Sequence, residues 1–218
     1  MTLAREKRHN ALSDTVYENL RRQIVTGRLK AGQRVTEQHI AESEGIRRAP
    51  VREALKRLDE DGLLTLLPRS GCYVRRFTPE EVNDILEIRK RLESLALEYA
   101  FGRFDLNKIR TLRKRFQACL ELDEPKLARK ELRLDGQLHS LICEASGSRN
   151  VQDLLGKLWA RIRVFRAREA MAGGRARVAL KGHIGILDAI LAADKEKALR
   201  LLEEHIETAR KYTLATSQ

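Results

Sequence analysis

Three histidines and one aspartate in the second half of the chain have the residue types and the spacing of metal ligands. Asp135 and His139 are four residues apart, so on a helix their side chains leave the same face one turn apart. His183 and His205 each lie within a later apolar run that has helical spacing. Three imidazoles and one carboxylate can bind zinc, nickel, manganese or iron and leave positions open for a further ligand. A lone buried histidine is more often a hydrogen-bonded core residue, so a metal site depends on all four meeting.

A second set of residues could bind phosphate groups and base edges. These residues are Arg47, Arg48 and Arg52. The stretch from Thr36 to Leu63 predicts two short helices joined by a tight turn at Gly45, and the arginines come at the start of the second helix. A helix N-terminus favours phosphate, and arginine can bind guanine or phosphate through two parallel hydrogen bonds. The pattern indicates a DNA recognition helix, although a solvated basic surface would also give it.

A β hairpin is predicted directly after these two helices. Residues 63–67 and 72–74 read as strands, separated by the turn Pro68-Arg69-Ser70-Gly71. At the tip of the hairpin, Arg69 could reach a minor groove or a phosphate, and Gly71 would let the backbone approach closely. Two helices followed by such a hairpin make a winged helix-turn-helix.

Composition agrees with a polyanionic partner but does not locate it. The 218 residues carry a formal net charge of +12, and the excess is shared equally between the parts before and after residue 78. No apolar run approaches the roughly 20 residues of a membrane span, and the N-terminus has no signal-peptide pattern. We therefore expect a cytoplasmic protein with no membrane partner. The three cysteines lie far apart and match neither a zinc motif nor a disulfide framework.

A domain boundary is predicted near Thr78, which is followed by Pro79 and two glutamates as at a helix start. Beyond it the chain shows six segments with helical periodicity, separated by short loops, which implies an antiparallel bundle. The expected fold class is mainly α, with an N-terminal winged helix-turn-helix containing a small β hairpin and a C-terminal all-helical bundle. The expected domains are a flexible arm over 1–11, a DNA-binding domain over 12–77, and an effector-binding and dimerisation domain over 78–218.

The N-terminal pattern resembles the GntR family of bacterial transcription regulators. The matching residues include Gly27-Arg28-Leu29, Gly45-Ile46, Pro50-Val51-Arg52-Glu53-Ala54-Leu55, Gly62-Leu63 and Gly71. The resemblance implies that Arg34, Arg48 and Arg52 contact a double-stranded DNA operator and that Gly71 lies against its backbone or minor groove. Arg47 departs from the family, which usually has a small hydroxyl residue there. Losing that cap costs about 1 kcal/mol, and Arg47 becomes a further candidate for DNA contact.

The later helices resemble the effector domain of the FadR branch of this family, called FCD. The resemblance implies a divalent metal ion bound by Asp135, His139, His183 and His205, with a small organic acid as effector at or beside it. Arg89 matches a pocket arginine of the family and could pair with the effector carboxylate. Asn150 and Arg163 are weaker candidates, whose direction depends on how their helix is rotated.

These features predict a homodimeric, ligand-responsive transcription regulator, most simply a repressor, and not an enzyme. A two-fold protein requires a two-fold site, so the operator should be an inverted repeat. Two alternatives stay open. A metalloenzyme could use the same aspartate and histidines, although no further nucleophile or proton shuttle accompanies them. An architectural DNA binder could instead carry a structural metal.

Overall fold

The chain forms two compact units, and each is described by itself. The computed structural model describes residues 2–67, 70–172 and 175–216. The first unit is Met1–Phe77 and the second is Thr78–Gln218. Thr78 is thus the first residue of the second unit.

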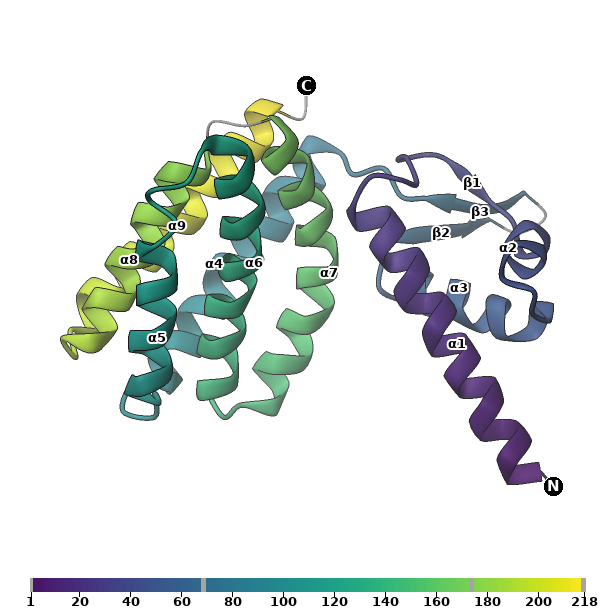
Figure 1. The fold of residues 1–218 in the computed structure, drawn as a ribbon, viewed down its shortest axis with the longest axis horizontal. Helices are drawn as coiled ribbons and strands as arrows, with labels where there is room; N and C mark the ends of the chain where they lie inside the picture. Colours follow the sequence, from purple (N-terminus) through teal and green to yellow (C-terminus); the bar gives the residue numbers. More distant parts are fainter. Residues whose placement is uncertain (1, 68–69, 173–174, 217–218) are drawn as a thin grey trace. The chain divides into compact units, whose positions relative to one another are not determined.

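The first unit combines three helices with a small antiparallel sheet (Figure 1). Its elements are α1 (Thr2–Val25), β1 (Arg34–Val35), α2 (Glu37–Glu44), α3 (Arg48–Glu60), β2 (Leu64–Leu67) and β3 (Gly71–Val74). The sheet has the order β1-β3-β2, so β3 lies in the centre and pairs with both neighbours. This is the winged helix-turn-helix that the sequence predicted, with β1 as an added edge strand.

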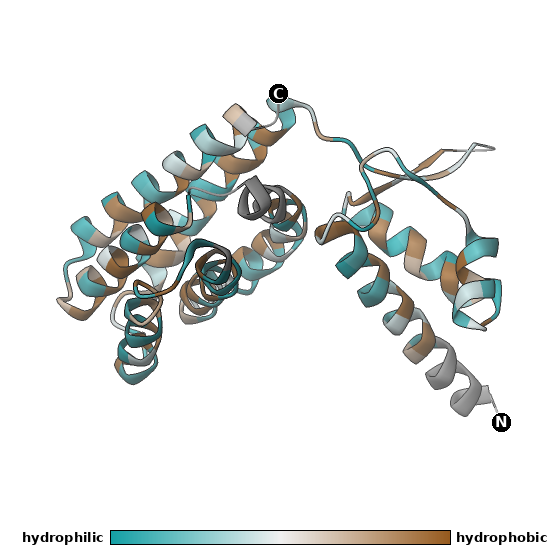
Figure 2. Cartoon of the chain, turned by 45° about the horizontal axis from the view of Figure 1, so that its top comes forward, coloured by the Kyte–Doolittle hydropathy of each residue, from teal (hydrophilic) through white to brown (hydrophobic). Residues whose placement is uncertain are grey.

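Helices α1 and α3 supply the core of this unit. Val16, Leu20 and Ile24 form the buried stripe of α1, and α3 buries Val51 and Leu58 completely. These residues recur at helical spacing, so each helix is apolar on one face and polar on the other (Figure 2). Burial of these faces fixes which side chains of α3 remain outside.

The structure differs from the sequence-based expectation at two places in this unit. Helix α1 begins at Thr2, within residues 1–11 that we expected to form a flexible arm. This segment contains no glycine or proline and is rich in strong helix formers, which favours helix over a flexible arm. Strand β1 was not among the predicted strands, because its two residues are too few to show an alternating pattern.

The second unit is an all-helical bundle (Figure 1). Its helices are α4 (Pro79–Ala100), α5 (Leu106–Gln117), α6 (Glu124–Ala145), α7 (Arg149–Ala172), α8 (Ala176–Leu191) and α9 (Lys195–Thr216). Helix α4 packs against α6, α7 and α9, while α8 packs against α5, α6 and α9. Four of these helices, α4, α6, α8 and α9, therefore enclose one shared interior. Among the described residues, no helix combines the length and apolar composition needed to cross a membrane.

Helix α4 has the strongest start signal of the bundle. The Thr78 hydroxyl accepts a hydrogen bond from the Glu81 amide, and the Glu81 carboxylate accepts one from the Thr78 amide. Pro79 takes a first-turn position where no amide donor is needed. This reciprocal capping box fixes the residue at which the bundle begins.

Candidate functional site

The start of α3 presents a group of exposed arginines. Arg47 is the N-cap residue with extended backbone and makes no capping hydrogen bond, and Arg48 is the first residue of the helix. Their side chains and that of Arg52 are exposed, whereas Val51 and Leu55 of the same helix are buried. The structure therefore brings three of the predicted DNA-binding residues to one helix end, where free amides also favour phosphate.

Arg52 is held by a partner that the sequence interpretation missed. Its Nε and Nη2 atoms donate to the two carboxylate oxygens of Glu37, each at 2.9 Å. The hydrogen bond and the charge of Glu37 raise the pKa of Arg52. The pair joins the first residue of α2 to the fifth residue of α3. It uses one edge of the Arg52 guanidinium, and the Arg52 side chain is 71% exposed. Glu37 thereby orients Arg52, and only the packing of α2 on α3 reveals this.

Arg34 and Gly71 lie together on the two strands that pair in the sheet. Gly71 has a φ of +108°, and a Cβ atom there would lie 3.1 Å from the Arg34 Nε atom. A side chain at this position would thus be strained and would push the Arg34 guanidinium aside. Arg34 is exposed. Arg69, the other wing residue that we predicted to contact DNA, lies outside the described residues.

The four predicted metal ligands converge inside the bundle. Asp135 and His139 come from α6, His183 from α8 and His205 from α9, and all four side chains are buried. The Nε2 atoms of His183, His139 and His205 lie 3.2, 3.6 and 3.8 Å from Asp135 Oδ1. One donor atom from each residue lies within 4.8 Å of every other.

These residues fit a divalent metal ion. The Nε2 atoms of His139 and His205 are buried without a hydrogen-bond partner among the described residues, which is costly unless another group takes up their lone pairs. Neighbouring donors around a tetrahedral ion with bonds of about 2.1 Å lie about 3.4 Å apart, close to the separations found here. Imidazole nitrogen with carboxylate oxygen suits zinc, nickel, manganese or iron.

Two carboxylates stand behind the histidines, on the side away from Asp135. Glu93 Oε2 lies 2.5 Å from His139 Nδ1, and Glu131 Oε1 lies 3.7 Å from His183 Nδ1. Burial lowers the pKa of His139, but the charges of Glu93 and Asp135 outweigh it and raise that pKa. Burial, together with the nearby His183, lowers the pKa of His205 well below its ordinary value. The sequence interpretation missed both glutamates.

A signal for Glu93 was present in the sequence. Val82, Leu86, Leu97 and Ala100 mark the buried stripe of α4, and Glu93 falls on that stripe with Arg89 one turn before it. Charged residues four apart usually read as a surface ion pair. Because Arg89 and Glu93 lie on the apolar stripe of α4, they indicate instead a buried ion pair, and a buried pair needs further polar partners inside the bundle.

Gly182 on α8 makes room for one of the histidines. A Cβ atom at this position would lie 3.2 Å from His205 Nδ1 and 3.8 Å from His205 Cβ. A side chain at residue 182 would thus crowd the His205 ring and require it to shift by a few tenths of an ångström. No sequence pattern distinguishes such a glycine from an ordinary helical one.

The three predicted effector-binding residues lie in different places. Arg89 is 2% exposed and donates from Nε to Glu93 Oε1 at 2.8 Å, so it is joined to the histidine cluster through that carboxylate. Asn150 and Arg163 have exposed side chains on α7 and do not join the buried cluster, because the helix turns its apolar residues inward at these positions. The structure therefore does not place these two side chains beside the histidine cluster.

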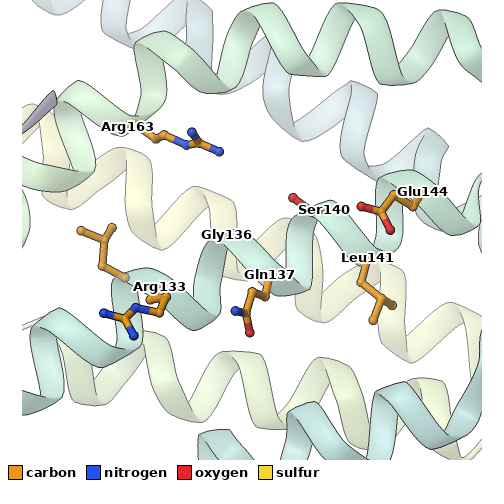
Figure 3. A pocket seen from close by; sticks show the side chains of 8 residues that line it. Arg133, Gly136, Gln137, Ser140, Leu141, Glu144 and Arg163 are labelled. Atoms are coloured by element: carbon orange, nitrogen blue, oxygen red, sulfur yellow. The ribbon is translucent and has the colours of Figure 1, made fainter. Parts of the chain in front are cut away.

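Arg163 instead lines a groove of about 490 Å³ between α6 and α7 (Figure 3). Arg133, Gln137 and Glu144 are among the polar residues on the α6 side of this groove. They alternate along α6 with the buried ligands Asp135 and His139. The groove and the histidine cluster thus use different faces of one helix.

Comparison with protein families gives one match for each unit. The profile described as bacterial regulatory proteins, gntR family, matches residues 12–74. The profile of the FCD domain matches residues 84–208. Together they span both compact units.

Individual proteins agree with these matches. The HTH-type transcriptional regulator YdhC of Bacillus subtilis is 30% identical over 190 residues, covering 87% of this chain and 85% of YdhC. The HTH-type transcriptional repressor RspR of Escherichia coli is 26% identical over 202 residues, covering 90% of this chain and 86% of RspR. Among solved structures, McbR/YncC of E. coli has a TM-score of 0.79 at 23% identity, covering 95% of this chain and 99% of that one. At this identity the structural likeness supports the fold.

Proposed function

The chain belongs to the GntR family of bacterial transcription regulators with an FCD domain, and from this premise we propose that it is a homodimeric repressor whose FCD domain binds a divalent metal ion and a small carboxylate effector. It is a DNA-binding regulator and not an enzyme, so the metalloenzyme alternative is set aside. The observation that carries the proposal is the convergence of three histidine Nε2 atoms on Asp135 Oδ1 inside the bundle.

The proposed DNA contacts are made by α3 and the wing. Arg47, Arg48 and Arg52 are exposed at the end of α3 where free amides also face outward. Arginine forks at this position can bind guanine or phosphate. Arg34, Arg69 and Gly71 would add contacts from the wing to the backbone or minor groove.

Asp135, His139, His183 and His205 would hold the proposed metal ion, and an ion that accepts five or six ligands would leave positions for an effector. A bound divalent ion would supply a Lewis-acidic centre that attracts a carboxylate. Arg89 is the proposed additional contact, because it is the one predicted effector residue that the structure connects to the cluster. Asn150 and Arg163 are not part of this proposed pocket.

Helix α4 is the proposed route from effector to DNA-binding domain. It begins at the unit boundary and carries Arg89 and Glu93, which reach the histidine cluster. An effector can shift the regulator only if it binds two arrangements of the bundle with different affinity. Release from DNA on effector binding is the direction we propose, in line with RspR, which is named a repressor.

The exposed face of α4 supports the proposed homodimer. Ile88, Leu92, Leu95 and Tyr99 follow one another at intervals of four, three and four residues, the spacing of a seam between two packed helices. Ile88 is 50% exposed and Tyr99 is 46% exposed. The same helix of a second copy would cover this stripe about a two-fold axis.

Selection of bound sequences from a random duplex pool tests the proposal, using the full chain loaded with zinc and the same protein stripped by a chelator. We expect enrichment of an inverted repeat, and weaker binding to it when a panel of small mono-, di- and tricarboxylates is added to the zinc-loaded protein. Enrichment of an asymmetric site would contradict the dimer. An operator affinity that no carboxylate changes would favour the remaining alternative, a DNA binder with a structural metal.

A further inference from the structure

Glu93 is the most enclosed carboxylate near the metal ligands, and it is in contact with three other residues. It is 1% exposed. Its Oε1 atom accepts hydrogen bonds from Arg89 Nε at 2.8 Å and from Trp159 Nε1 at 3.0 Å, and its Oε2 atom lies 2.5 Å from His139 Nδ1. The contacts join α4, α6 and α7. Oε1 therefore faces two donors, Arg89 and Trp159, while Oε2 faces His139.

Glu93 forms a buried ion pair with a permanent cation. Arg89 is always protonated, its Nε atom donates to Glu93 Oε1 at 2.8 Å, and both side chains are 2% exposed. A buried guanidinium needs an anionic partner, so this contact requires the carboxylate form of Glu93. An ionised carboxylate can only accept hydrogen bonds. The proton between Glu93 Oε2 and His139 Nδ1 must therefore be bonded to Nδ1, which is the donor.

The position of that proton decides which nitrogen of His139 can bind a metal ion. With the proton on Nδ1, the lone pair is on Nε2, the atom that lies 3.6 Å from Asp135 Oδ1. Glu93 itself is not among the residues whose donor atoms converge. Its place is behind the histidine, where carboxylates orient ligand imidazoles in metal sites.

We propose that Glu93 is a positioning residue that fixes the Nδ1-protonated form of His139, and that Trp159 and Arg89 fix Glu93 in turn. This inference rests on the proposed metal site. It assigns a role to the single tryptophan of the chain. Because the indole N–H of Trp159 bonds the same carboxylate that contacts His139, metal binding should also change its fluorescence.

Glu93→Gln is the sharpest test, because the two oxygens of Glu93 have different partners. Arg89 and Trp159 both donate to Oε1, so the amide oxygen of glutamine should stay there. The amide NH₂ group is then directed at His139 Nδ1, and as a donor it favours the form protonated on Nε2. That form has no lone pair for the metal.

The measurement is zinc affinity of the full chain by competition with a chromophoric chelator, together with thermal unfolding of the zinc-free protein. We expect Glu93→Gln to weaken zinc binding about 10–100-fold. Glu98→Gln is the matched control, since it removes the same charge from an exposed position of α4. Its zinc affinity should equal that of the wild type.

The outcomes separate this inference from the proposed metal site. Failure of the wild type itself to bind zinc would overturn the metal site. Binding by the wild type with equal affinity in Glu93→Gln would overturn the role of Glu93 alone, and a loss of zinc-free stability without loss of affinity would make Glu93 a purely structural core residue.

Imidazole nitrogen NMR of the zinc-loaded wild type provides a second test that does not depend on folding of a variant. We expect His139 to carry its proton on Nδ1 and to bind through Nε2, and we expect zinc addition to change Trp159 fluorescence. Zinc bound through His139 Nδ1 would overturn the inference. Unchanged fluorescence at full zinc occupancy would remove Trp159 from it.

Discussion

His183 is the most enclosed of the candidate ligands, with no measurable exposure, and its Nε2 atom comes closest to Asp135. Replacement by alanine removes a donor without introducing a new polar group. We expect His183→Ala to reduce the metal content of the protein. Mutation of a residue that only supports a metal ligand weakens metal binding by at most roughly 100-fold, so loss of a ligand itself should weaken zinc binding by more than that. Elemental analysis and chelator competition measure this. His39→Ala, at an exposed histidine of α2, should retain the wild-type metal content.

The environment of Tyr17 predicts how the stability of the fold changes at alkaline pH. Its hydroxyl donates to Asp61, and burial together with this bond raises the pKa of Tyr17 to about 12. Above pH 10 the unfolded chain loses the tyrosine proton while the folded chain keeps it, so stability falls as the pH rises from 10 to 12. We expect this group to account for about 1 kcal/mol of that loss, since solvent screens part of the effect.

Urea unfolding of the wild type and of Tyr17→Phe at several pH values over this range measures the contribution of Tyr17. The variant should be less stable near neutral pH and should lose less stability on going from pH 10 to 12. Asp61→Asn removes the charged acceptor and should flatten the curve in the same way. If the free energy of unfolding fell equally with pH in the wild type and both variants, Tyr17 would not be the group responsible.

At the scale of single residues, the sequence predicts a candidate site where spacing and apolar context agree. Asp135 and His139 share a helix face, and His183 and His205 interrupt apolar stripes, so a common location could be inferred. Glu93 was missed because its contact with His139 joins helices far apart in the chain. The sequence left the direction of Asn150 and Arg163 open, because neither residue type carries a signal that fixes the rotation of α7.

Helix α3 is the element on which DNA binding is expected to depend. Its buried face packs on α1, so replacement of Arg48 at its exposed end leaves the core unchanged. We expect Arg48→Ala to weaken operator binding roughly tenfold or more and to reduce the salt dependence by about one ion if the contact is to phosphate. Fluorescence anisotropy over a salt series measures both quantities.

Lys126→Ala is the control for this experiment, since it removes one positive charge from the exposed start of α6. It should leave operator affinity nearly unchanged. Equal weakening by the two variants would mean that net charge, and not the arginine at the helix end, governs binding.

The capping box at the start of α4 makes a separate prediction about stability. Thr78→Ala removes the hydroxyl that accepts from the Glu81 amide and leaves that amide without its protein partner. We expect a loss of about 1 kcal/mol, measured by urea unfolding, with Thr78→Ser close to the wild type because serine keeps the acceptor. A neutral Thr78→Ala would mean that water replaces the cap fully.

At the scale of elements, apolar periodicity predicted the helices of both units, and the starts of α2, α4, α5 and α6 also carry a Thr or Asp at the N-cap. Two features escaped. The first part of α1 has no apolar periodicity in its sequence to distinguish helix from disordered chain. Strand β1 is defined by its pairing with β3 at Arg34 and Val35. Both depend on context that a local pattern does not contain.

At the scale of the whole molecule, the proposed dimer determines what kind of operator is read. A single winged domain presents one recognition helix, and a two-fold pair presents two at a fixed spacing. Net charge could not have predicted this arrangement, since the positive excess is spread over both parts of the chain. The exposed apolar stripe on α4 is the feature that a second copy would explain.

Ile88→Glu tests that stripe, because it places a charge where the proposed partner helix would pack. Burial of one isoleucine side chain contributes about 1.5–3 kcal/mol, and a two-fold interface loses it twice. We therefore expect the dimer dissociation constant to rise at least about 100-fold, as measured by sedimentation over a concentration series. Val178→Glu is the control, since it introduces the same charge at a similarly exposed apolar residue of α8. Loss of the dimer should also abolish the preference for an inverted repeat over a single half-site. If the Ile88→Glu protein remains dimeric, the interface lies elsewhere on the chain.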